Sequence, residues 1–201
     1  NIENIITSSW KASGDSIWLL GLPPEKETST LDNRISLSAS SYLEFIHGLI
    51  TGRPPKIDLK LEVFLQKLIR KAISKSLLSS AHDVSDGGLS VCLAECSISS
   101  KMGIECVLPL SDVRIDRLLF AEGGSRVIVS VSSEKLTLWN SFIKDYQTQH
   151  GSFLLATKLG NVTKEDRFVI KQSSNTLINL KLVKLQHSFE NAIPRRLGVD
   201  F

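Results

Sequence analysis

The chain has 201 residues, of which 42% are hydrophobic and 22% charged, and its net charge is +3. This composition excludes collagen-like, disordered and coiled-coil proteins, and no stretch approaches the ~18 uninterrupted apolar residues of a membrane span. The excess charge lies in residues 171–201, where five Lys or Arg stand against two acidic residues, whereas nucleic-acid-binding proteins carry a clustered basic face. We therefore expect neither a nucleic acid nor a membrane as a partner.

Strands and helices alternate along the predicted chain. Apolar runs or a two-residue alternation predict strands, and apolar residues repeated every three or four positions predict helices. In chain order we expect a strand at residues 17–22, helices at 42–50 and 59–78, a strand at 79–82, a helix at 88–100, a strand at 104–108, a short helix or turn at 114–120, a strand at 126–131, a helix at 134–146, strands at 152–162, 167–171 and 175–180, and a helix at 181–190.

Local residues support several of these elements. Residues 17–22 are apolar on both faces, which is typical of a strand covered on both sides, and a loop follows to residue 32. Asp58 stands at the N-cap position of the helix at 59–78, and Pro54 and Pro55 prevent the preceding helix from continuing. The interleaving predicts the α/β or α+β class, with a mixed sheet covered by helices.

Domain organisation follows from the same pattern. We expect one folded domain over residues 14–190, preceded by residues 1–13 as a linker or the remnant of another domain, and followed by a polar tail over residues 191–201. The sequence starts with Asn1 instead of Met, and residues 1–10 have no secretory signal, which indicates a piece of a larger protein. The mean hydropathy of +0.04 is high for a soluble chain and favours a partner that covers part of the surface.

Three cysteines, Cys92, Cys96 and Cys106, are an odd number. Cys92 and Cys96 lie four residues apart on one face of a predicted helix, and no His stands near them in the sequence to complete a zinc site. We expect small buried thiols in a reducing compartment, the cytoplasm.

The densest polar cluster lies between a predicted strand and a predicted helix and contains Asp83, Ser85, Asp86, Gly87 and Gly88. A helix N-terminus offers unpaired N–H groups, and glycines allow a ligand close to the backbone, so the cluster suits a phosphate. Asp83 and Asp86 could share a Mg²⁺ ion with that phosphate. The alternative is purely structural, with Asp86 capping the helix and Asp83 closing a turn.

A second cluster contains Glu122, Gly123, Gly124, Ser125 and Arg126 and precedes a predicted strand. Its backbone N–H groups could surround an anion, and Arg126 could hold a phosphate through two hydrogen bonds. The alternative is a tight turn with Arg126 in solvent or paired with Glu122.

No catalytic residue emerges from the sequence. Ser85, Ser125 and the four His residues form no recognisable nucleophile arrangement, and the chain has no GxSxG, P-loop or GxGxxG motif. His82 beside Asp83 could act as a base, although a single His at a strand end is more often a packed core residue.

The run SAHDVSDGGLSV, from Ser80 to Val91, resembles the signature of the aminoimidazole ribonucleotide synthetase superfamily in its C-terminal type of domain. Within the superfamily, the chain is most similar to the synthetase subunit of the phosphoribosylformylglycinamidine synthase family. The segments that agree in order cover about residues 14–190, and they include GD at 14–15, HG at 47–48, LFAE at 119–122, SR at 125–126 and LGNV at 159–162.

This resemblance implies the C-terminal α/β domain of the second half of a two-part synthetase. The family uses ATP and Mg²⁺ to activate the amide of formylglycinamide ribonucleotide, and ammonia from a glutaminase subunit or domain then forms the amidine. Its catalytic His and its main nucleotide and metal residues precede Asn1, so the resemblance implies that the chain is inactive alone. The remainder of the synthetase subunit, the glutaminase and the ribonucleotide are the implied partners.

Two departures from the family pattern leave the role of the phosphate site open. The segments 37–42 and 120–124 differ from the usual residues, so the site is either an auxiliary nucleotide pocket or only a scaffold. Two other functions also remain open. One is that of a thiamine-phosphate kinase, selenophosphate synthetase or hydrogenase-maturation relative, and the other is that of a non-catalytic interaction module.

Overall fold

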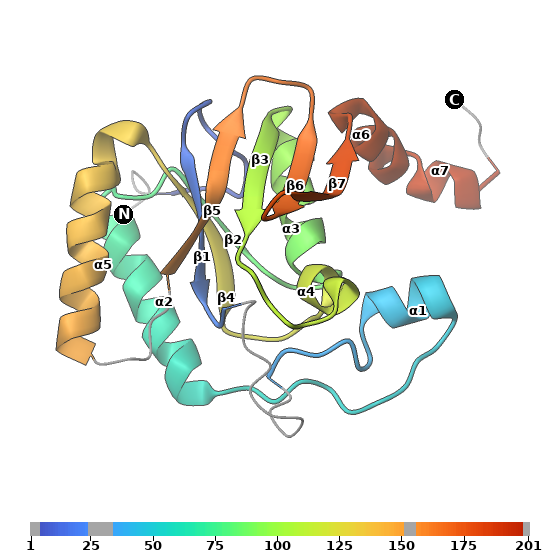
Figure 1. Cartoon of the computed structure of the whole chain (residues 1–201), viewed down its shortest axis with the longest axis horizontal. Helices are drawn as coiled ribbons and strands as arrows, with labels where there is room; N and C mark the ends of the chain where they lie inside the picture. The colour runs from blue at the N-terminus through green and yellow to red at the C-terminus, as the bar shows by residue number, and fades with distance from the viewer. Residues whose placement is uncertain (1–4, 24–33, 151–155, 199–201) are drawn as a thin grey trace.

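A mixed sheet of seven strands forms the centre of the structure, a computed structural model that describes residues 5–23, 34–150 and 156–198 (Figure 1). The strands are β1 (Ser16–Gly21), β2 (Ser80–Asp83), β3 (Gly103–Leu108), β4 (Arg126–Val131), β5 (Ala156–Thr163), β6 (Phe168–Gln172) and β7 (Asn175–Leu180). Their order is β2-β4-β1-β5-β3-β6-β7, and neighbours are antiparallel except β3 and β6. The predicted mixed sheet is confirmed.

Helices cover both faces of this sheet. They are α1 (Ser41–His47), α2 (Leu59–Ser74), α3 (Gly88–Ser100), α4 (Ile115–Phe120), α5 (Leu136–His150), α6 (Leu182–Glu190) and α7 (Ala192–Arg196), with a 3-10 turn at Ser133–Lys135. Helices α2 and α5 lie on one side, and α3, α4 and α6 lie on the other (Figure 1). None of the helices in the described ranges is both long and apolar enough to cross a membrane.

Strand β1 shows how the sequence builds the two cores. Ile17 and Leu19 pack into the cluster that includes α3 and α4, whereas Leu20 packs into the cluster that includes α2 and α5. All three side chains are buried, because a central strand with helices on both faces has no solvent side. The strand's apolar character on both faces therefore predicted its place in the sheet correctly.

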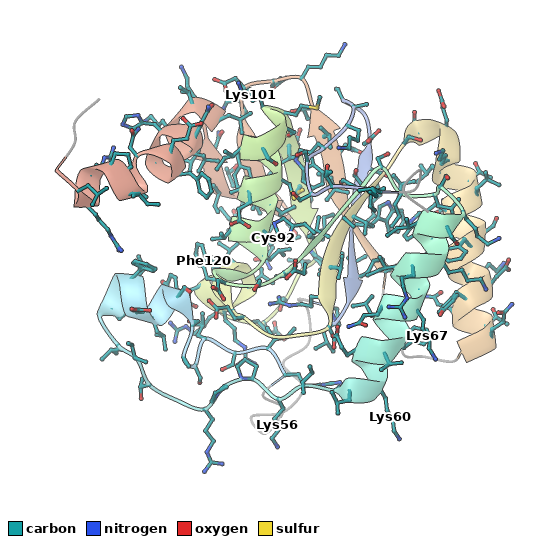
Figure 2. The ribbon with its side chains drawn as sticks, turned by 180° about the vertical axis from the view of Figure 1, so that it is seen from behind. Lys56, Lys60, Lys67, Cys92, Lys101 and Phe120 are labelled. Atoms are coloured by element: carbon teal, nitrogen blue, oxygen red, sulfur yellow. The ribbon has the colours of Figure 1, made fainter. Side chains whose placement is uncertain are left out.

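Helix α2 begins where the sequence predicted. The Asp58 side chain accepts hydrogen bonds at 3.1 Å from the backbone N–H groups of Lys60 and Leu61, which satisfies two of the donors that a helix start leaves unpaired. Lys56 and Lys60 extend outward into solvent from the loop and the first turn (Figure 2). The helix ends at Ser74 and not at residue 78, because Ser76 has a φ of 53° that is incompatible with a continuing helix.

Two other predictions of the pattern need correction. Helix α1 ends at His47 and not at residue 50, since Gly48 has a φ of 65° and terminates it. The region 191–201, predicted as a polar tail, contains helix α7, and its Ile193 and Leu197 are exposed. The expected loop at residues 24–32 and the start of the strand at 152–155 lie outside the described residues.

Residues before position 14 pack against the domain. Trp10 is buried in the core on the α3 side, and its Nε1 donates a hydrogen bond of 3.1 Å to Ser97 Oγ. The backbone carbonyl of Thr7 accepts from the N–H of Ala81 in the edge strand β2. This segment was expected to be a linker or a remnant of another domain, yet its described part contributes to the core.

Candidate functional site

The two polar clusters predicted from the sequence lie on one cavity of about 460 Å³. From the first cluster, Asp83, Ser85 and Asp86 line it, whereas Gly87 and Gly88 do not. The whole of the second cluster lines it, namely Glu122, Gly123, Gly124, Ser125 and Arg126. The remaining lining residues are Pro55, Ile57, Glu62, Leu65, Val84 and Val127.

Backbone packing explains why the clusters meet. The first cluster connects the end of β2 to Gly88, the first residue of α3, which has a φ of 70°. A Cβ atom at Gly88 would lie 2.7 Å from the carbonyl oxygen of Ala121, so only a glycine allows this approach to the chain that leaves α4. The second cluster then enters β4, whose residue Val127 pairs with Asp83 in β2.

Glu122 connects the two clusters. Its Oε1 accepts hydrogen bonds of 2.8 Å from the backbone N–H groups of Gly87 and Ser41. Gly87 is the N-cap of α3 and Ser41 is the first residue of α1, so one carboxylate serves the N-terminal ends of two helices. The backbone donor at the start of α3, which we expected to face a phosphate, therefore contacts an anion of the protein itself.

Helix α3 has no side-chain cap among the described residues, because its N-cap is Gly87. Asp86 therefore does not cap the helix, which excludes that part of the structural alternative. The side chain of Asp86 is exposed at the cavity instead.

Arg126 lies beneath the cavity and is 3% exposed. Its Nη2 donates to the carbonyl oxygen of Ala121 at 2.6 Å, whereas its Nε has no hydrogen-bond partner among the described residues. Burial lowers the pKa of Arg126 to about 10, although Cys92 and Glu122 act in the opposite direction. The alternative in which Arg126 lies in solvent is excluded by its burial, and an anion in the cavity could satisfy this buried donor.

The predicted metal pair, Asp83 and Asp86, consists of two exposed residues. Asp83 Oδ1 lies 3.4 Å from His82 Nδ1, and its side chain is 75% exposed. Within the described ranges, neither Asp belongs to a group of three potential ligand residues with donor atoms within 4.8 Å of one another. Mg²⁺ is commonly held by one or two carboxylates together with phosphate oxygens, so the pair suits this ion only beside a bound phosphate.

Sequence reasoning missed Glu62 as a residue of the site. Its Oε2 accepts a hydrogen bond of 2.8 Å from Ser125 Oγ, which ties the second cluster to the first turn of α2. In the sequence, Glu62 looks like any acidic residue near a helix start. Its position four residues after the Asp58 cap puts Glu62 in the first turn of α2, where it lines the cavity.

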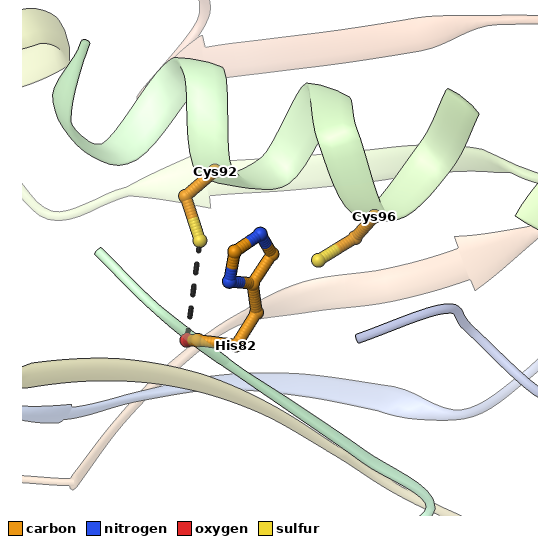
Figure 3. A group of neighbouring side chains, drawn as sticks. All are labelled: His82, Cys92 and Cys96. Atoms are coloured by element: carbon orange, nitrogen blue, oxygen red, sulfur yellow. Dashed lines mark hydrogen bonds between the residues drawn. The ribbon is translucent and has the colours of Figure 1, made fainter. Parts of the chain in front are cut away.

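His82 belongs to a different group of side chains and does not line the cavity. Its ring is brought to Cys92 and Cys96 of α3, and one potential ligand atom from each residue lies within 4.8 Å of the other two (Figure 3). Residue spacing does not indicate this proximity, because His82 precedes the nearer cysteine by ten residues and lies on another element. No His stands near these thiols in the sequence, but the fold brings His82 to them in space.

Residues 12–173 match the protein family described as AIR synthase related protein, C-terminal domain. The chain belongs to this family. The match covers both polar clusters and all strands except β7, which agrees with the resemblance of the run around Asp83.

Curated relatives give the same placement. The chain is 48% identical over 200 residues to the phosphoribosylformylglycinamidine synthase subunit PurL of Prochlorococcus marinus strain MIT 9313, and 43% identical over 190 residues to the protein of the same name from Synechococcus strain WH7803. The first alignment covers 100% of this chain and 25% of the relative. The chain therefore spans about a quarter of the length of the relatives that it matches.

Solved structures show the same fold. Thermotoga maritima PurL complexed with FGAR superimposes with a TM-score of 0.69 at 15% identity, covering 92% of this chain and 30% of that chain. T. maritima PurL complexed with ATP gives a TM-score of 0.64 at 14% identity, with coverages of 92% and 27%. The hydrogenase maturation protein HypE from E. coli gives 0.55 at 14% identity over 88% of this chain and 51% of that chain.

Proposed function

We propose that this chain is the C-terminal domain of the second half of a synthetase that makes formylglycinamidine ribonucleotide. The synthetase converts formylglycinamide ribonucleotide, ATP and ammonia released from glutamine into the amidine, ADP and phosphate. Support comes from the 48% identity to a phosphoribosylformylglycinamidine synthase subunit over the full chain. The chain covers only a quarter of that relative, and we assign the chemical step to the remainder of the synthetase and no catalytic residue to this chain.

The cavity between the two clusters serves this synthetase as a phosphate-binding pocket. The observation that carries this role is the buried Arg126, whose Nε has no hydrogen-bond partner in the described part of the chain. A phosphate oxygen at the cavity wall would accept from this nitrogen and would compensate a positive charge that burial otherwise penalises. Ser125, Gly123 and Gly124 would border the same anion.

The acidic residues at the opening would then hold the cation. Asp83 and Asp86 would bind Mg²⁺ together with phosphate oxygens, and the ion would neutralise charge on a nucleotide. Glu122 stays bound to the N–H of Gly87 and keeps the first cluster in shape. We therefore assign the pocket to an auxiliary nucleotide, ADP or ATP, that stabilises the domain without being consumed.

The remainder of the synthetase is the partner that this chain requires. Helix α1, all of whose residues are described, buries none of them, and Phe45 and Ile46 are 70% and 63% exposed. Leu49 and Ile50 extend this apolar surface beyond the helix with exposures of 51% and 79%. Contiguous exposed apolar residues of this kind mark an interface, which we assign to the remainder of the synthetase. The glutaminase would then bind the assembled synthetase.

Calorimetry with Mg²⁺ and ADP tests the pocket. The chain should bind ADP with micromolar affinity, and Asp83→Ala and Asp86→Ala should weaken binding at least tenfold. Arg126→Lys keeps the positive charge but removes Nε, so it should weaken binding as well. Asp145→Ala, at an exposed position on α5, is the matched control and should bind like the wild type. Absence of binding, or equal binding by all variants, would show that the cavity is only a scaffold.

A further inference from the structure

Two buried thiols and an imidazole meet on the face of the sheet that α3 covers. His82 lies in β2, one residue before its end, while Cys92 and Cys96 lie one turn apart on α3. One ligand-type atom from each residue lies within 4.8 Å of the other two, and the ring of His82 points between the two sulfur atoms (Figure 3). Cys92 and Cys96 are 2% and 0% exposed, so solvent reaches the group from the side of His82.

Carboxylates hold the imidazole in this position. Glu95 Oε2 lies 3.1 Å from His82 Nε2, and Asp83 Oδ1 lies 3.4 Å from Nδ1. A carboxylate on one ring nitrogen is the common way in which proteins orient a metal-binding His, so Glu95 on Nε2 leaves Nδ1, which has the longer contact with Asp83, as the nitrogen for a metal. Glu95 also lies on α3 between the two cysteines, so one turn of helix supplies both sulfur atoms and the contact to the ring.

The electrostatic surroundings of the thiols favour a cation. The carboxylates of Glu95 and Asp83 lie within 3.4 Å of the ring that borders the two thiols. The Cys92 thiol donates to the carbonyl oxygen of Asp83 at 3.3 Å. A divalent ion among these groups would displace the thiol protons, and the thiolates and the neighbouring carboxylates would balance its charge.

We propose that His82, Cys92 and Cys96 form a binding site for a soft divalent cation of the Zn²⁺ class. Two cysteines and one His are an established zinc ligand set in proteins, with a fourth position left for water. On binding, two sulfur–metal bonds and one nitrogen–metal bond form, and the two thiol protons leave to solvent. The bound ion would join the end of β2 to α3 directly beside Asp83, which also lines the phosphate pocket.

Cadmium and zinc titrations of the reduced chain test this site. We expect one Cd²⁺ per chain, with a sulfur-to-cadmium charge-transfer band in the ultraviolet, and Zn²⁺ should displace it. Cys92→Ser and Cys96→Ser should each abolish the band, and His82→Gln should weaken Zn²⁺ binding at least tenfold in competition with a chromophoric chelator. Cys106→Ser is the matched control, since Cys106 is a buried thiol in β3 outside the group, and it should bind like the wild type.

The outcomes separate a metal site from ordinary packing. Absence of a band in the wild type, or a band that persists in both Cys92→Ser and Cys96→Ser, would overturn the proposal. Circular dichroism checks that each variant is folded. If a serine variant unfolds, thermal unfolding of the wild type decides the question, because Zn²⁺ should raise the unfolding temperature of the wild type and of Cys106→Ser but not that of His82→Gln.

Discussion

The carboxylate of Glu122 accepts a hydrogen bond of 2.8 Å from the backbone N–H of Gly87, which lies 35 residues away in the sequence. The same oxygen accepts from Ser41, so Glu122 fixes α1 and α3 relative to the chain that leaves α4. The N-terminus of α3, where we predicted a phosphate, therefore already has a carboxylate of the protein as its partner. Under the proposed function, an external anion would bind at the buried Arg126 and not at this N–H.

Replacing Glu122 should separate its structural role from its charge. Glu122→Ala leaves the N–H groups of Gly87 and Ser41 without their acceptor, and we expect a loss of about 1–3 kcal/mol in the free energy of unfolding. Glu122→Gln keeps a carbonyl acceptor and should lose less. Because Glu122→Gln removes a negative charge near Arg126, it should also bind inorganic phosphate more tightly than the wild type when Mg²⁺ is absent. Urea unfolding and calorimetry measure the two effects, and an unchanged stability of Glu122→Ala would contradict the structural role.

Gly88 should tolerate no side chain. A Cβ atom there would lie 2.7 Å from Ala121 O, and its φ of 70° is unfavourable for other residues, so we expect Gly88→Ala to cost about 2–4 kcal/mol. Gly48→Ala is the matched control, because Gly48 has a φ of 65° but no atom within 4 Å of its Cβ position. It should lose only the backbone cost of about 1–2 kcal/mol. Equal losses in the free energy of unfolding, measured by chemical denaturation, would show that the contact with Ala121 adds no cost beyond that of the backbone conformation.

The N-cap of α2 should contribute measurably to stability. Asp58→Ala removes both hydrogen bonds at the helix start, and we expect the free energy of unfolding to fall by about 1 kcal/mol. Asp58→Asn retains a side-chain acceptor and should stay close to the wild type. A loss of equal size in both variants would point to charge and not to capping as the cause.

Asp15 should make the stability depend on pH. Burial raises the pKa of its carboxyl above the usual 3.8, although hydrogen bonds with Ser79 and the backbone of Ala12 act against this. The folded chain therefore keeps this proton to a higher pH than the unfolded chain does. Its contribution to stability is present below pH 3.8 and is lost as the pH rises through the raised pKa.

Asp15→Asn removes this titration. In urea unfolding across a pH series, the variant should lose less stability than the wild type between pH 3.8 and neutrality. The exposed Asp145→Asn serves as a control and should follow the wild-type curve. A variant curve parallel to that of the wild type would mean that Asp15 titrates as an ordinary surface carboxyl.

Sequence patterns predicted elements that depend on local residues. The alternation in 126–131 gave the bounds of β4, and Asp58 gave the start of α2, because a strand face and a helix cap are encoded within a few residues. The end of α2 was wrong, since Leu77 continues the apolar repeat although it is buried outside the helix.

Contacts between distant segments were beyond this kind of prediction. The two polar clusters were recognised separately, but nothing in the sequence showed that Glu122 would contact Gly87 or that Glu62 would reach Ser125. His82 and Cys96 were likewise assigned to unrelated roles. In each case the pairing arises from the strand order of the sheet and from the packing of α3 on it, which residue spacing alone does not encode.

A chimeric synthetase gives the most direct test of the assigned function. This chain would replace the matching quarter of the Prochlorococcus marinus subunit to which it is 48% identical, and amidine formation from formylglycinamide ribonucleotide, ATP and ammonia would be measured. We predict that the chimera forms the amidine, whereas the 201-residue chain alone does not. A folded chimera without activity, or turnover by the isolated chain, would contradict its assignment as a domain of this synthetase.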